Sequence, residues 1–130
     1  MISRNTYINA LKPFINQPQI KIITGIRRSG KSTVLQLLKE ELLKANVQPN
    51  QIISINFESF AYTELLSAVK LYQFIKSELK SSEKYYLLLD EIQEVHEWEK
   101  AINSFLVDFN VDIYLTGSNS HLLSSELATF

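Results

Sequence analysis

An eight-residue stretch near the N-terminus constrains the fold of this chain more than any other feature. Residues 25–32 read Gly-Ile-Arg-Arg-Ser-Gly-Lys-Ser and match the pattern G-x-x-x-x-G-K-[ST] in full. The glycines allow a tight turn in which successive backbone N–H groups point inward, and the nest that they form binds phosphate oxygens. In this pattern Lys31 approaches the β- and γ-phosphates, and the Ser32 hydroxyl is a ligand for Mg²⁺. The sequence therefore predicts a Walker A phosphate-binding loop.

The segments on either side of this loop supply the context that the motif requires. Residues 20–24 are β-branched and mostly apolar, as in a buried parallel strand. Residues 32–45 place three leucines on one helical face, and the start of that helix adds its positive dipole end beneath the phosphates. We expect nucleotide contacts along the whole stretch, which comprises Gly25, Ile26, Arg27, Arg28, Ser29, Gly30, Lys31, Ser32 and Thr33.

The rest of the chain alternates between strand and helix patterns. Apolar periodicity predicts a helix over residues 4–15 and further strands and helices over residues 52–57, 65–79, 85–90, 98–109 and 111–116. Strands that alternate with helices form right-handed βαβ units, so we expect an α/β fold with a parallel sheet covered by helices on both faces. Ligands bind such sheets at the carboxyl ends of the strands.

Two adjacent acids follow the most apolar of these strands. Residues 87–91 read Leu-Leu-Leu-Asp-Glu, which fits the hhhhDE pattern of a Walker B motif. Asp90 would hold Mg²⁺ opposite Ser32, and Glu91 would polarise the water that attacks the γ-phosphate. A solvated strand end is the alternative interpretation of the pair. Glu58, just past the second strand, is the alternative water-orienting residue.

The fourth predicted strand ends in a run of small polar residues. If this strand lies between the phosphate-loop strand and the acidic strand, a residue at its tip can contact the γ-phosphate and the attacking water. Thr116, Ser118 and Asn119 are the candidates, with Ser118 and Asn119 nearest the expected position. A plain turn followed by a helix N-cap would also favour these residue types.

Composition and charge restrict the kind of protein. The 130 residues are 45% hydrophobic and include no cysteine, so one domain with a real core is expected, without disulfides or thiolate metal sites. No apolar run approaches the roughly 20 residues of a membrane span, and a signal-peptide core is lacking, so we expect a cytoplasmic protein without a membrane partner. The net charge of −1 indicates no general affinity for nucleic acid.

The charges are unevenly distributed along the chain. Residues 1–50 carry 8 basic and 2 acidic side chains, whereas residues 51–130 carry 5 and 12. Arg27 and Arg28 therefore either concentrate positive potential at the nucleotide mouth or reflect ordinary surface variation.

Taken together, these stretches resemble the AAA_14 group of prokaryotic AAA-type ATPases, whose members usually carry a DUF4143 C-terminal region. The stretches that carry the resemblance are residues 13–15, 23–33, 56–58, 89–93, 98–99, 116–119 and 127–129. The resemblance implies an additional-strand AAA+ core, a P-loop NTPase with sheet order 5-1-4-3-2. It also implies ATP rather than GTP as the nucleotide, with Mg²⁺.

The C-terminal stretch departs from that pattern. Four strands are predicted, and residues 124–130 read as part of a helix. We therefore expect a single, truncated P-loop domain over residues 1–130, with residues 1–18 as an N-terminal helical segment. Its fifth strand and lid would be missing and one edge of the phosphate-loop strand unpaired. The arginine finger of such proteins would lie beyond residue 130.

Three functions use such a loop. The first is Mg²⁺-dependent ATP binding and hydrolysis, an ATPase acting as an AAA+ motor or switch, as an oligomer or with a partner protein. The second is a nucleotide-gated interaction module with little turnover. The third, a small-molecule kinase, needs an Arg-bearing lid, and no Arg follows Asp90. Nucleic-acid contact is compatible by analogy with related ATPases, but neither charge nor motifs support it.

Overall fold

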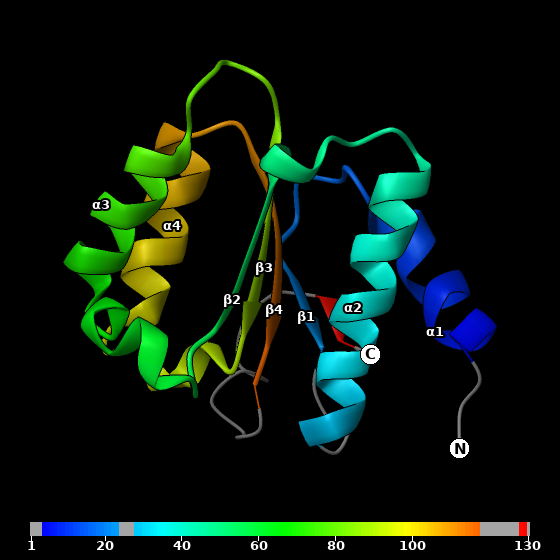
Figure 1. Ribbon diagram of the computed structural model, residues 1–130, viewed down its shortest axis with the longest axis horizontal. Coiled ribbons are helices and arrows are strands. Elements are labelled where there is room, and N and C mark those ends of the chain that lie inside the picture. The colour runs from blue at the N-terminus through cyan, green and yellow to red at the C-terminus, as the bar shows by residue number, and fades with distance from the viewer. Residues whose placement is uncertain (1–3, 24–27, 118–127, 130) are drawn as a thin grey trace.

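In the computed structural model a parallel sheet lies between two layers of helices (Figure 1). The structure describes the backbone of residues 4–23, 28–117 and 128–129 and the side chains of residues 8–23 and 34–117. The described strands are β1 (Lys21–Ile23), β2 (Ile52–Asn56), β3 (Tyr85–Asp90), β4 (Val111–Thr116) and β5 (Ala128–Thr129). Their order is β2-β3-β4-β1-β5, and each neighbouring pair is parallel. This confirms the order 5-1-4-3-2 expected from the resemblance.

Helices cover both faces of the sheet, as predicted. The helical elements are α1 (Arg4–Leu11), η1 (Lys12–Phe14), α2 (Arg28–Lys44), η2 (Pro49–Gln51), η3 (Phe60–Leu65), α3 (Ala68–Glu78), η4 (Ile92–Glu94) and α4 (Trp98–Asp108). In Figure 1, α1 and α2 lie on one side of the sheet and α3 and α4 on the other. Each side has its own apolar core, so every central strand is buried on both faces.

Strand alternation decides which side chains enter which core. Along β3, Tyr86 and Leu88 belong to the core on the α1/α2 side, while Leu87 and Leu89 belong to the core on the α3/α4 side. Successive side chains of a strand point to opposite faces, so Asp90 lies on the α1/α2 side. The last residue of β3 is therefore presented to the same side of the sheet as α2.

The prediction that the fifth strand is missing was wrong. Residues 128–129 form β5, which pairs with β1 in the register Lys21 to Ala128 and Ile22 to Thr129. The helix expected over residues 124–130 is thus contradicted at these two residues, and residues 118–127 and 130 lie outside the described part of the chain. Because β5 pairs with β1, β1 is not the unpaired apolar edge that we expected.

Two helix boundaries also differ from those read from apolar periodicity. The helix after the phosphate loop was expected to begin at Ser32, but α2 begins at Arg28. The helix predicted over residues 65–79 was expected to begin too early, because Leu65 ends the preceding element η3 and α3 begins at Ala68. A serine precedes each of these two elements. Ser59 Oγ accepts a hydrogen bond from Ala61 N (3.2 Å), and Ser67 Oγ accepts one from Lys70 N (3.3 Å).

A charged pair is buried in the core on the α1/α2 side. Lys21 in β1 donates to Asp112 Oδ1 in β4, and both side chains are almost completely inaccessible to solvent. Lys21 Nζ also donates to the carbonyl of Gln17 (2.5 Å), and the Tyr114 hydroxyl donates to Asp112 Oδ2 (2.5 Å). Asn16 extends this network, because its N–H donates to Asp112 Oδ2 (2.9 Å). The network joins two strands to the segment that leads from α1 into the sheet.

Burial shifts the pKa values of Lys21 and Tyr114 in the direction that favours the neutral form of each side chain. Desolvation lowers the pKa of Lys21 below its usual value, although Asp112 counteracts part of this effect. Desolvation raises the pKa of the Tyr114 hydroxyl, and the neighbouring Asp112 raises it further. Desolvation is the largest cause of both shifts, and for Lys21 the hydrogen bond and charge of Asp112 oppose it, so Asp112 is the group that favours the ammonium form.

We predict that Asp112→Leu destabilises the protein by about 3–5 kcal/mol, because it leaves the Lys21 ammonium buried without its counterion. Lys21→Met combined with Asp112→Leu should recover a large part of that loss, since two apolar side chains replace the pair. Urea unfolding of the two variants and the parent protein measures both effects. An unfolding free energy of Asp112→Leu equal to that of the parent would contradict the assignment.

Candidate nucleotide-binding site

The carboxyl ends of the central strands meet at one edge of the sheet, where the predicted motifs lie. Strand pairing aligns Ile23 with Thr116 and Asn56 with Asp90. The start of α2, at Arg28, lies at the same end of the sheet (Figure 1). The end of β1, the start of α2 and the acidic end of β3 are therefore brought to one place, as the sequence predicted.

Thr116, at the end of β4, connects directly to the acidic strand. The Thr116 hydroxyl donates to Asp90 Oδ1, and Thr116 Oγ1 accepts a hydrogen bond from the Glu91 N–H (2.8 Å). The Thr116 side chain is fully buried. A threonine hydroxyl has one hydrogen to donate, and here the Asp90 carboxylate takes it. In this arrangement Thr116 holds the two acids at the end of β3.

Glu91 adopts a backbone conformation that is uncommon for a residue with a side chain. Its φ of 58° and ψ of 54° lie in the left-handed region, and its exposure is 1%. Such backbone angles cost energy outside glycine and are concentrated at functional sites. The turn allows the chain to leave β3 and enter η4 directly after Asp90.

Gln93 contacts the side chain of Glu91. Its Nε2 donates to Glu91 Oε1 over 2.7 Å, within the short turn η4. Because an ionised carboxylate only accepts hydrogen bonds, the amide nitrogen is the atom that must face it. Sequence analysis assigned no role to Gln93, since two residues of separation give no signal in a strand or helix period.

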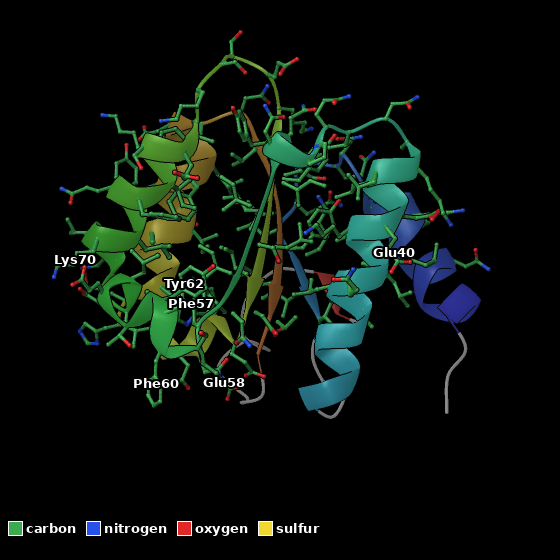
Figure 2. All side chains as sticks on the ribbon, viewed as in Figure 1. Glu40, Phe57, Glu58, Phe60, Tyr62 and Lys70 are labelled. Atoms are coloured by element: carbon green, nitrogen blue, oxygen red, sulfur yellow. The ribbon has the colours of Figure 1, made fainter. Side chains whose placement is uncertain are left out.

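Glu58, the alternative water-orienting residue, lies at the end of β2. Its side chain is exposed, and its N–H donates to Asn56 Oδ1 (3.0 Å). Figure 2 shows Glu58 at the same end of the sheet as the start of α2, with Phe60 projecting from the body nearby. Since β2 is an edge strand and β3 separates it from β4, Glu58 is farther along the sheet from β1 than the acid pair is.

Several predicted site residues lie outside what the structure describes. Residues 24–27 are outside it, as are the side chains of residues 28–33 and two of the three sensor candidates, Ser118 and Asn119. The predictions for Gly25, Ile26, Arg27, Arg28, Ser29, Gly30, Lys31, Ser32, Thr33, Ser118 and Asn119 therefore remain predictions at the level of side chains. The backbone of residues 28–33 forms the start of α2, in agreement with a loop that leads into a helix.

Among the described residues we find neither a cluster of metal-binding side chains nor a helix that could span a membrane. Within residues 8–23 and 34–117, no group of three or more His, Asp or Glu side chains is arranged to hold a metal ion. In the described part of the chain, every helix is too short or too polar to span a membrane.

Comparison with known proteins agrees with the fold. The sequence model of the AAA_14 family, described as an AAA domain, matches residues 17–130. The chain belongs to this family of AAA domains, a class with a nucleotide-binding, ATPase-like function. No solved structure matches the chain.

Three curated relatives are similar to this chain. An uncharacterized protein of Haemophilus influenzae is 45% identical over 99% of this chain and 32% of its own length. Two uncharacterized proteins of Methanocaldococcus jannaschii are 35% and 26% identical, over 85% and 81% of this chain. The chain spans about a third or less of the length of these relatives.

We predict that Thr116→Val, which removes only the hydroxyl in nearly the same volume, destabilises the protein by about 1–3 kcal/mol. The change leaves the Asp90 carboxylate and the Glu91 N–H without this buried partner. Chemical unfolding measures the loss, and Thr116→Ser, which keeps the hydroxyl, should retain most of the stability. Equal stability of the Val and Ser variants would show that these hydrogen bonds contribute nothing.

Proposed function

We propose that this domain binds ATP with Mg²⁺ and hydrolyses it as a motor or switch of the AAA+ type. The observation that carries the proposal is the placement of Asp90. It ends β3 on the side of the sheet covered by α2, and only β4 lies between β3 and β1. A carboxylate at this place lies at the end of the sheet where α2 starts, and on the side of the sheet that α2 covers.

The residues around this edge suit a magnesium nucleotide. Mg²⁺ prefers oxygen ligands, and in proteins it commonly takes one or two carboxylates together with substrate phosphates. We assign the Ser32 hydroxyl and the Asp90 carboxylate to Mg²⁺ and the loop amides with Lys31 to the phosphates. The Thr116 hydrogen bond supports this assignment, because it fixes one oxygen of Asp90 and limits the orientations of the other. The bound Mg²⁺ would neutralise charge that develops on the phosphate oxygens.

The remaining roles concern the attacking water. We assign its orientation to Glu91, with Ser118 or Asn119 sensing the γ-phosphate from the end of β4. Phosphoryl transfer depends mainly on positioning and electrostatic stabilisation, so small displacements of these groups should reduce the rate strongly. The proximity of the β3 and β4 ends supports this assignment.

A nucleotide-gated interaction module with little turnover is the second candidate. The 1% exposure of Glu91 favours it, because a carboxylate must reach a water molecule to orient it. The curated relatives are at least about three times longer than the matched region.

We predict that Lys31→Ala weakens Mg²⁺-dependent ATP binding strongly, because phosphate oxygens lose their main point-charge partner. Titration of a fluorescent ATP analogue into the full-length protein measures the affinity. Lys39→Ala, a change at a half-buried lysine farther along α2, is the matched control and should leave affinity unchanged. Unchanged affinity of Lys31→Ala would refute the assignment of the loop.

We predict that Glu91→Gln retains ATP binding but lowers turnover by on the order of 10² or more, the range typical of a lost general base. Phosphate release and nucleotide affinity are measured on the same full-length preparation. Glu94→Gln, at an exposed position in η4, is the control and should keep the parent rate. If Glu91→Gln hydrolyses ATP at the parent rate, the water-orienting role belongs elsewhere. Negligible turnover by the parent itself would favour the interaction module.

A further inference from the structure

The turn η4 holds Gln93 at a defined place beside Glu91. Ile92 and Val95, on either side of Gln93, are buried in the core on the α3/α4 side. Backbone hydrogen bonds from Glu94 N to Glu91 O (3.1 Å) and from Val95 N to Ile92 O (3.0 Å) close the turn. The Gln93 backbone therefore cannot move far without pulling apolar side chains out of the core.

The segment is fixed at both of its ends as well. Upstream, the Glu91 N–H is bonded to Thr116 Oγ1 in β4 (2.8 Å). Downstream, the His96 N–H donates to the Leu66 carbonyl between η3 and α3 (2.9 Å). With the backbone fixed in this way, the main remaining freedom of Glu91 is rotation of its carboxylate.

The hydrogen bond from Gln93 Nε2 to Glu91 Oε1 restricts that rotation (2.7 Å). A carboxamide suits this task for two reasons. It is neutral, so it does not form an ion pair with the carboxylate as a lysine or arginine would. Its NH₂ group can only donate hydrogen bonds, and the carboxylate can only accept them. A hydrogen bond to an ionised carboxylate is also shorter and stronger than one between neutral groups.

We propose that Gln93 is a positioning residue for Glu91, holding its carboxylate in the orientation that directs the attacking water. This inference rests on the proposed ATPase function and on the role assigned to Glu91 there. Gln93 itself would contact neither nucleotide nor water in the reaction. Its effect should therefore appear in turnover and should depend on the presence of a carboxylate at position 91.

The test compares steady-state ATP hydrolysis and ATP affinity in the full-length protein and four variants. Gln93→Met keeps the length of the side chain and removes the N–H donor, and Gln93→Asn keeps the amide but shortens its reach. Glu91→Gln and the double variant Glu91→Gln with Gln93→Met complete a double-mutant cycle. Gln73→Met, at an exposed glutamine of α3, is the matched control.

We expect Gln93→Met to lower kcat on the order of tenfold, as displaced reacting groups do, while ATP affinity changes less than about twofold. Gln93→Asn should fall between Gln93→Met and the parent, and Gln73→Met should equal the parent. In the Glu91→Gln background, Gln93→Met should add no further loss. A role limited to packing would instead lower kcat by the same factor in both backgrounds.

Different failures separate this inference from the proposed function. If Glu91→Gln abolishes turnover while Gln93→Met and Gln93→Asn keep the parent rate, the inference is overturned and the role of Glu91 stands. Faster turnover of Gln93→Met would also overturn it, because the amide would then restrain Glu91 from acting. If the parent protein does not hydrolyse ATP, or if Glu91→Gln retains full activity, both the inference and the proposed catalytic role are overturned.

Discussion

The position of β4 between β1 and β3 is the constraint on which the rest of the site depends. Neighbouring strands lie about 4.8 Å apart, so one intervening strand separates the phosphate-loop strand from the acidic strand by roughly 10 Å. In the proposed function, that distance is the room available for phosphate, metal and water beside the acids. It also places the end of β4 at the middle of the edge, where Thr116 can bond to both Asp90 and Glu91.

Much of the fold followed from local patterns in the sequence. Strands 85–90 and 111–116 were predicted with the bounds that β3 and β4 have, because both are rich in apolar, β-branched and aromatic residues and are bounded by polar or turn residues. β5 was missed because Ala128–Thr129 has almost no strand pattern of its own, and its pairing with β1 decides its conformation. The start of α3 was placed too early because the apolar period extends back to Leu65, whereas the Ser67 cap acts locally.

The candidate site shows the same contrast between contiguous patterns, which can be predicted from the sequence, and long-range contacts, which cannot. The acid pair could be predicted because a Walker B motif is a contiguous pattern, and parallel topology brings it to the edge where the phosphate loop is expected. The partners of these acids could not be predicted. Thr116 is 26 residues from Asp90, and the choice between sensing phosphate and supporting Asp90 depends on where one hydroxyl points. The role of Lys21 could not be predicted either, because its partner Asp112 is 91 residues away in the sequence.

The buried pair of Lys21 and Asp112 has a consequence for strand register. β1 has three residues, and Ile22 and Ile23 alone would pack almost as well if the strand were shifted along β4. A shift by one residue would turn Lys21 toward the apolar core on the other face, and a shift by two that places Lys21 level with Thr116 would move it away from Asp112. Either of these errors would leave a charge buried without its partner, so the ion pair disfavours both. With β1 held in its observed register, Ile23 stays level with Thr116, and the ion pair thereby fixes the point at which the chain leaves the sheet before α2.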